Sequence, residues 1–429
     1  MKVNARSLVV WMVTIQIAAV VAVLAWLWIQ VFYLGNTQIV SLLTFPASER
    51  PPVTEVPYAM GVHTFGDFLL PIEQARVPNP WIDYTLILNP YPSGLMALFR
   101  MFTVLPYTFA FLLFFVANGL SMTLPLMIAS RRIPPAEAIT TICILGLLSC
   151  PFVMTLDRAN AQGLLAFPLY LFVVDWRTGR WRIGLVSLIA AAVLKLYPLL
   201  LVVVFLVERR YRSAIVFVTA TIGITIALFA TYPYGLGRTL KAFFDGVAIY
   251  GHPTASSITN YNYSIDGLIA HVVTNTYGIS SPVLIWLVRF PWICGILYFG
   301  MVVTILIRSK VPFVVRVACV LSVLTMVVPI SYGYTLSFVL VIIAELLWQS
   351  SQIKELSLEP QLAISLALAV LATTIPWPIA LPVSHDSLGT LVVPAAWAGL
   401  TFVAFLHSYG RREGMIHGST FSRQREVAE

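Results

Sequence analysis

The sequence predicts an all-α, polytopic membrane protein. Of its 429 residues, 59% are hydrophobic and only 10% are charged, whereas a soluble domain carries about 25% charged residues. Apolar runs of roughly 20 residues, long enough to cross a bilayer, recur along the chain with short basic clusters beside them. Most of the net charge of +8 lies in those clusters, which is typical of cytoplasmic anchors. We therefore do not expect nucleic acid as a partner.

A lysine inside one apolar run predicts a break in the helix pattern. Lys195 lies in the middle of Ile183–Val207, which is basic at both ends (Arg177, Arg180 and Arg182 before it; Arg209, Arg210 and Arg212 after it). An ammonium group at the bilayer centre costs about 2.5–3.5 kcal/mol, and two basic ends on one span conflict with the positive-inside rule. A re-entrant hairpin that breaks at Tyr197-Pro198 and presents Lys195 to a polar chamber resolves both conflicts.

The remaining runs predict about ten crossings around this hairpin. The first, Leu8–Leu34, is too long for a signal-peptide core and is expected to be an uncleaved anchor. The others fall at about 104–129, 136–155, 164–175, 213–231, 283–307, 312–329, 336–348, 362–381 and 391–406. The sidedness of the basic clusters is consistent only if the Lys195 run enters and leaves on the same face.

This layout predicts an integral membrane domain over residues 1–410 and a polar cytoplasmic tail over 411–429. Two long segments, about 35–103 and 232–282, are expected on the outer face, where the polar residues concentrate. Loops commonly carry catalytic groups on a helical scaffold. We expect a multi-pass protein of the cell (plasma) membrane with an extracytoplasmic active site and a substrate that is partly lipid.

Polar motifs recur in or beside the outer segments, and each has a structural alternative. Asp67 opens an amphipathic stretch and is either a solvated loop carboxylate or a catalytic base. Tyr91-Pro92 precedes a run where Pro suits the first turn of a helix, and Tyr91 is also a candidate substrate ligand. Asp157, Arg158 and Asn160 form a polar turn that is either an ion pair with a helix cap or, through Arg158, a phosphate ligand.

The later motifs also have a structural alternative beside the functional one. Lys195 could reach an interface with its long stem, but its central position favours a role in binding phosphate, with Tyr197 beside it. Asn262 and Ser264 lie in NYNYSIDGL, and Tyr332 and Tyr334 lie in PISYGYTL. Such side chains can bind sugars, and they are also common in the aromatic belts of membrane proteins.

The order of these motifs resembles glycosyltransferase family 87. Asp in the first outer segment, YP, DRAN, KLYP, NYS and PISYGY follow one another from Asp67 to about Ser337. The resemblance implies a membrane enzyme of the GT-C class that takes sugar from a polyprenyl-phosphate donor. Two departures are visible: relatives often have Gly where Ala159 stands, and many have a histidine in the last motif, where this chain has Tyr332 and Tyr334.

The resemblance implies transfer of mannose or a related sugar to a glycan or glycolipid acceptor at the outer face. Asp67 is the expected base, and Lys195 and Arg158 are expected to stabilise the departing lipid phosphate. The expected substrate ligands are Asp157, Asn160, Tyr91, Tyr197, Asn262, Ser264, Tyr332 and Tyr334.

No metal or cofactor is expected, because no carboxylate-histidine cluster is visible and the four scattered cysteines form no CxxC pair. A transporter or flippase, or a polymerase, of lipid-linked saccharides is the alternative function. A transporter or flippase would share the buried Lys195 and Arg158 but would more often show an inverted repeat, and we find no convincing repeat; a polymerase would share the many spans and the long outer loops.

Overall fold

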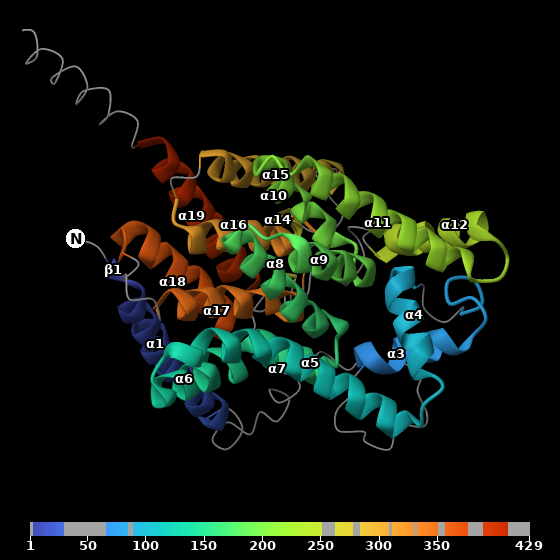
Figure 1. The fold of residues 1–429 in the computed structure, drawn as a ribbon, viewed down its shortest axis with the longest axis horizontal. Helices are drawn as coiled ribbons and strands as arrows, with labels where there is room; N and C mark the ends of the chain where they lie inside the picture. Colours follow the sequence, from blue (N-terminus) through green and yellow to red (C-terminus); the bar gives the residue numbers. More distant parts are fainter. Residues whose placement is uncertain are drawn as a thin grey trace, which may run out of the picture.

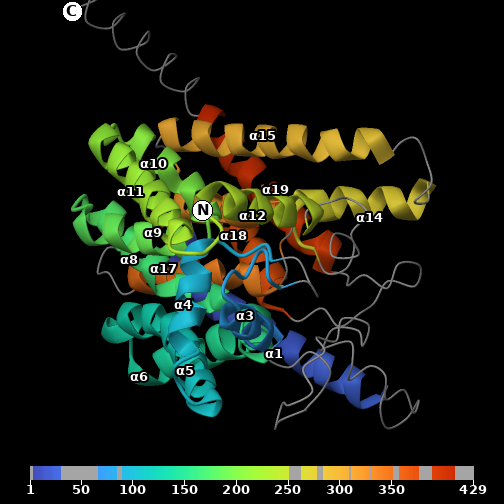
Figure 2. The same ribbon diagram turned by 90° about the vertical axis from the view of Figure 1, so that its right-hand side faces the viewer.

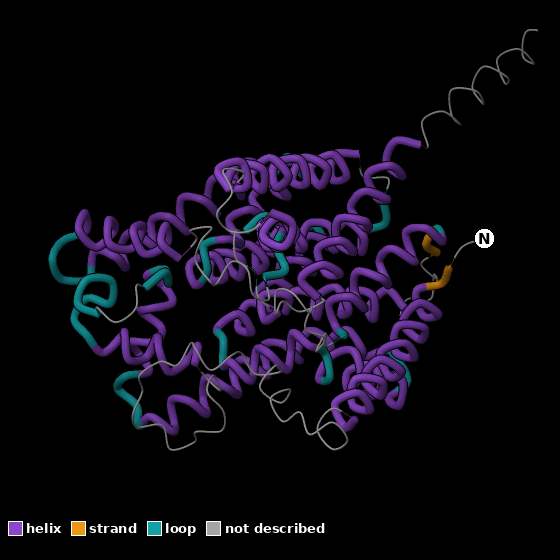
Figure 3. The backbone as a smooth tube through the Cα atoms, turned by 180° about the vertical axis from the view of Figure 1, so that it is seen from behind, coloured by secondary structure: helices purple, strands orange, loops and turns teal. Residues whose placement is uncertain are grey.

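The computed structural model confirms the all-α class. It describes residues 3–29, 66–84, 89–250, 262–277, 284–308, 311–328, 331, 333–350, 357–375 and 389–410. About half of the first predicted outer segment and the whole predicted tail therefore lie outside the described residues. Helices dominate the described part of the chain (Figure 3).

The first half of the chain builds a bundle of long and short helices. Its elements are β1 (Val3–Asn4), α1 (Ala5–Trp28), α3 (Gly66–Arg76), α4 (Ser93–Phe102), α5 (Tyr107–Ala129), η4 (Ser130–Arg132), α6 (Pro135–Thr141), η5 (Ile142–Leu147), α7 (Cys150–Arg158), η6 (Ala161–Leu165), α8 (Ala166–Thr178), α9 (Arg182–Leu194), η7 (Tyr197–Leu201) and α10 (Val202–Val207).

The second half adds helices on the same core. They are α11 (Tyr211–Ala230), α12 (Leu236–Tyr250), α14 (Ile265–Tyr277), α15 (Leu284–Arg308), α16 (Phe313–Met326), η8 (Gly333–Phe338), α17 (Val339–Ser350), α18 (Pro360–Thr374) and α19 (Gly389–Gly410), with β2 (Ser357–Leu358) between α17 and α18. Strands β1 and β2 pair antiparallel, Val3 opposite Leu358.

Helices α16 and α17 form the centre of the molecule. Every residue of α17 from Val339 to Leu347 is at most 1% exposed, and a helix that is apolar on all sides belongs in a protein interior. In contrast, α1, α11 and α15 expose large apolar side chains such as Trp11, Ile215 and Ile296. Exposed apolar surfaces of this kind suit contact with lipid rather than water.

Five described helices are long and apolar enough to cross a membrane, and a bent pair could add a sixth. The five spans are Ala5–Trp26, Tyr107–Arg132, Tyr211–Ala230, Phe290–Arg308 and Gly389–Tyr409. The bent pair joins Pro135–Leu147 to Cys150–Arg158 at an angle of 57° and occupies the crossing predicted at 136–155. Several other predicted crossings are shorter apolar helices, so the total of ten stays a prediction.

The Lys195 run forms two short helices whose far ends meet. The ring of Trp181, before α9, lies 5.2 Å from that of Phe205 in α10, and Trp176 Nε1 donates to Glu208 Oε1 at 2.9 Å. The chain therefore turns back on itself, as the hairpin prediction requires. The break lies slightly earlier than predicted: α9 ends at Leu194, and Lys195 itself is extended.

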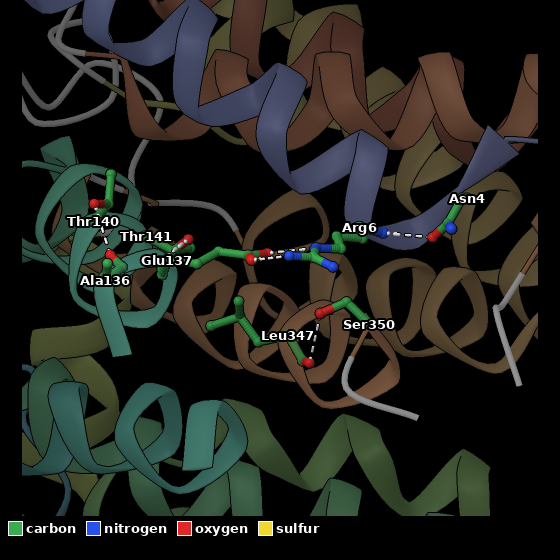
Figure 4. A network of polar contacts seen from close by, with 8 residues as sticks. All are labelled: Asn4, Arg6, Ala136, Glu137, Thr140, Thr141, Leu347 and Ser350. Carbon is green, nitrogen blue, oxygen red and sulfur yellow. Dashed lines mark hydrogen bonds and ion pairs between the residues drawn. The ribbon is translucent and has the colours of Figure 1, made fainter. Parts of the chain in front are cut away.

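Helices α3, α4 and α12 gather at one end of the molecule, and β1 lies at the opposite end (Figure 1; Figure 2 looks onto the α12 end). At the β1 end, Asn4 caps α1 by accepting the N–H of Arg6 at 2.8 Å. Arg6 in turn pairs with Glu137 of α6 at 2.6 Å (Figure 4). With 58% of the Arg6 side chain exposed, this pair contributes little to stability.

Candidate functional site

Asp67 lies in a polar cluster built from segments that are far apart in the sequence. Arg158 holds its carboxylate with two N–H groups, Nε to Oδ2 at 3.2 Å and Nη2 to Oδ1 at 3.0 Å. Asn160 Nδ2 donates to Oδ2 at 2.8 Å. The side chains of Asp67 and Arg158 are only 11% and 13% exposed. A bidentate pair of this kind fixes geometry as well as charge.

The loop after α7 explains why both Arg158 and Asn160 reach Asp67. Arg158 is the last residue of α7, Ala159 is left-handed (φ 47°, ψ 47°), and Asn160 directly precedes η6. Asn160 also caps η6, because its Oδ1 accepts the N–H of Gln162 at 2.8 Å. The predicted turn is thus shorter than expected, since Asp157 and Arg158 belong to the helix. The ion pair of Arg158 joins it to Asp67 in α3.

Lys195 lies near this cluster at the break between α9 and η7. Its Nζ is 5.0 Å from the centroid of the Tyr91 ring, and the charge of Asp67 acts on it. Among the residues that the structure describes, no carboxylate lies within ion-pair distance of Lys195. The ammonium is therefore held by an aromatic ring rather than neutralised by an acid.

The KLYP and DRAN motifs also meet. The hydroxyl of Tyr197 lies beside the side chain of Gln162, which follows Asn160 by two residues. The Ser337 hydroxyl of η8 donates to the Gln162 carbonyl at 3.5 Å. The residue that follows the last predicted motif therefore contacts η6, the element that comes after Arg158 and Asn160.

Asn262 and Ser264 join the fifth motif to the sixth. Asn262 Oδ1 accepts the N–H groups of Ser331 at 2.8 Å and Ser264 at 3.2 Å. Ser264 Oγ accepts the N–H of Gly267 at 3.0 Å and so caps α14. Asn262 and Ser264 are completely buried. These bonds make them organisers of the backbone, while direct contact with substrate stays a prediction.

The remaining predicted residues are less informative. Tyr332 lies outside the described residues, and for Tyr334 only the backbone, in η8, is described. Asp157 is partly buried at the end of α7. Asp266, in the segment predicted to lie on the outer face, opens α14, and burial raises its pKa to about 6. Within the described parts of the chain, no group of three or more His, Cys, Asp or Glu side chains could hold a metal ion.

Sequence reasoning did not single out three residues that build this region. Trp81 donates its indole N–H to the Tyr91 carbonyl at 3.0 Å. A Cβ on Gly94 would lie 2.3 Å from the Val193 carbonyl oxygen, and one on Gly267 would lie 2.3 Å from that of Asn262. A single sequence carries no signal for such close backbone approaches.

The fold and this cluster define a polytopic, all-helical membrane protein with a charged polar site assembled from its helix ends. The chain belongs to glycosyltransferase family 87: the family model matches residues 89–331, more than half of the sequence. It is therefore a membrane glycosyltransferase. No curated protein and no solved structure matches the chain. Asp67 precedes the matched residues and is tied to them through Arg158 and Asn160.

Proposed function

We propose that this glycosyltransferase moves mannose, or a related hexose or pentose, from a polyprenyl-phosphate donor to a hydroxyl of a glycan or glycolipid. We propose that the reaction takes place at the extracytoplasmic face of the cell membrane. The observation that carries the proposal is the meeting of Asp67, Arg158 and Asn160, with Lys195 close by. One acid and two cations in one buried site supply what such a transfer needs.

In the proposed step the acceptor oxygen attacks the anomeric carbon of the sugar. The bond from that carbon to the phosphate oxygen breaks, its electron pair stays on the lipid phosphate, and the acceptor proton passes to Asp67. A carboxylate has about four acceptor positions, and three are taken by Arg158 and Asn160. The remaining position on Oδ1 is the proposed site of proton acceptance.

Lys195 and Arg158 are proposed to bind the phosphate and to stabilise the charge that builds on it as the sugar leaves. Arg158 also donates to both carboxylate oxygens of Asp67, so a phosphate bound to the same guanidinium would place the leaving group next to the base. Tyr91, Tyr197 and Asp157, together with the buried Asn262 and Ser264, remain proposed contributors to sugar or acceptor binding. The tyrosines at 332 and 334 are proposed to contact the acceptor.

The proposed base is tested by replacing Asp67 with Asn, which keeps its size and can still accept from Arg158. We expect transfer of radiolabelled sugar from the polyprenyl-phosphate donor to fall by at least about 100-fold, while donor binding persists. Purified protein in vesicles without a transmembrane gradient separates transfer from transport. Asp245→Asn, on the exposed surface of α12, is the matched control and should leave turnover unchanged. Near-normal transfer by Asp67→Asn would assign the base elsewhere.

The proposed phosphate site is tested by Lys195→Met, which keeps the stem and removes the charge. The variant should express and fold normally, because an unpaired partly buried charge does not favour folding, yet bind donor weakly and transfer poorly. Combining it with Arg158→Gln should give a loss smaller than the sum of the two single losses, since the two groups share one partner. Unchanged donor affinity in Lys195→Met would contradict the proposal.

A further inference from the structure

The ring of Tyr91 lies beside the Lys195 ammonium, and buried side chains hold the backbone of Tyr91 in place. Its backbone N–H donates to Asn89 Oδ1 at 2.9 Å, and its carbonyl accepts the indole N–H of Trp81 at 3.0 Å. Trp81 is 4% exposed and packs against the rings of Phe229 at 4.8 Å and Tyr232 at 4.9 Å. Both backbone groups of Tyr91 are thus fixed by buried side chains.

The helices that carry the ring and the ammonium are also locked together. Helix α4 begins two residues after Tyr91, and α9 ends one residue before Lys195. Gly94 in the first turn of α4 approaches Val193 of α9 so closely that any Cβ would overlap the Val193 carbonyl, at 2.3 Å. This contact sets the spacing between Tyr91 and Lys195 through the backbone.

We propose that Tyr91 is a positioning residue for Lys195: the face of its ring holds the ammonium at the donor site and leaves the charge available to the lipid phosphate. The proposal rests on the proposed function of Lys195. A carboxylate partner would neutralise the ammonium, whereas a ring at 5.0 Å attracts it without accepting a conventional hydrogen bond from its three N–H donors. The charge that acts on Lys195 is that of Asp67 in α3, and Asp67 is itself paired with Arg158 of α7.

The competing role for Tyr91 is direct stacking on the donor sugar, and a ligand without a sugar separates the two. The probe is radiolabelled polyprenyl phosphate lacking the sugar, bound at equilibrium to the purified full chain. Tyr91→Leu should weaken its binding by about 2- to 30-fold, the range that a cation–ring contact supplies. Tyr91→Phe, which keeps the ring, should stay within about 2-fold of the unchanged protein.

A double-mutant cycle with Lys195→Met completes the test. Once the ammonium is gone, Tyr91→Leu should cause no further loss of lipid phosphate binding, because the effect of the ring passes through Lys195. Tyr211→Leu, at an exposed tyrosine beginning α11, is the control and should bind normally. If Tyr91→Leu fails to fold, Tyr91→Met replaces it with the same expectation.

Two results would overturn the positioning role alone. One is normal lipid phosphate binding by Tyr91→Leu beside a weakened Lys195→Met. The other is an equal Tyr91→Leu loss with and without Lys195, which would indicate an independent contact. Lys195→Met that binds lipid phosphate as tightly as the unchanged protein would instead overturn the proposed phosphate site.

Discussion

Ala159 has a backbone conformation that shapes the whole Asp67 cluster. Its φ of 47° lies in the left-handed region, which costs an L-residue roughly 1–2 kcal/mol and favours glycine after a helix. The turn lets the Asn160 N–H donate back to the Thr155 carbonyl at 3.0 Å while the Asn160 side chain reaches Asp67. Glycine, which lacks a Cβ, would adopt this conformation without that cost.

We therefore predict that Ala159→Gly retains transfer and is as stable as the unchanged protein or up to about 1 kcal/mol more stable, since relief of strain exceeds or offsets the extra freedom of unfolded glycine. Ala159→Val should lose several degrees of Tm and most of its activity, because a branched side chain is strained at this φ and the site is 1% exposed. Thermal unfolding in detergent measures both. Ala248→Val, on an exposed position of α12, should change stability by only about 0.5 kcal/mol.

At this scale the sequence predicted residue types better than it predicted contacts. Lys195 stood out because a charge is costly inside an apolar run, whereas Asp67 and Arg158 were singled out by the order of the motifs, and the roles of all three stay predictions. The pairing of Asp67 with Arg158 spans 91 positions and leaves no local pattern. The buried, backbone-directed bonds of Asn262 and Ser264 were equally invisible, because amide and hydroxyl side chains that bind sugars look the same as those that cap helices.

Among the elements, the α9–η7–α10 hairpin was the most predictable. Basic residues at both ends of one apolar run required both ends to share a face, and the Trp181–Phe205 contact brings those ends together. The position of the break was less predictable. Pro198 lacks an N–H, so the break was expected there, yet α9 already ends at Leu194 and Pro198 sits in the first turn of η7.

The hairpin makes a topological prediction. Single cysteines replacing Arg180 and Arg210, in a protein without Cys143, Cys150, Cys294 and Cys319, should both resist a membrane-impermeant thiol reagent in intact cells. Both cysteines should react with the reagent once the membrane is permeabilised. A cysteine replacing Lys241, exposed on α12, should react from outside and serves as the control. Labelling of only one of the two arginine positions in intact cells would contradict a same-side hairpin.

For the molecule as a whole, composition predicted the helical membrane class but not the number of crossings. The central helices are short: α16 has 14 residues and α17 has 12. Polar motifs interrupt the apolar runs, and the central helices are buried by other helices rather than by lipid. Some apolar runs that look like membrane crossings in the sequence are therefore helices surrounded by protein. Hydropathy alone does not distinguish a buried helix from a membrane-spanning one.

A buried ion pair joins α8 to the central helix α17 and gives the last prediction. Arg177, at the end of α8, contacts Glu345 of α17 at 2.5 Å. Its guanidinium lies 3.4 Å from the centroid of the Trp348 ring, and Gln349 donates to the same carboxylate at 2.7 Å. Glu345 is completely buried, so removing Arg177 leaves its charge without compensation. Such losses cost about 3–5 kcal/mol.

Arg177→Met should therefore lower Tm strongly and reduce the yield of folded protein. The double variant Arg177→Met/Glu345→Leu should recover most of that loss, because two apolar groups of similar bulk need no compensation. Turnover per folded molecule should stay near normal in the single and the double variant, since the Arg177–Glu345 pair lies at the opposite end of α8 from Asn160. Thermal unfolding together with turnover per folded molecule distinguishes this structural role from a catalytic one. A double variant as unstable as Arg177→Met would show that the buried pair itself, rather than the absence of an isolated charge, holds α8 to α17.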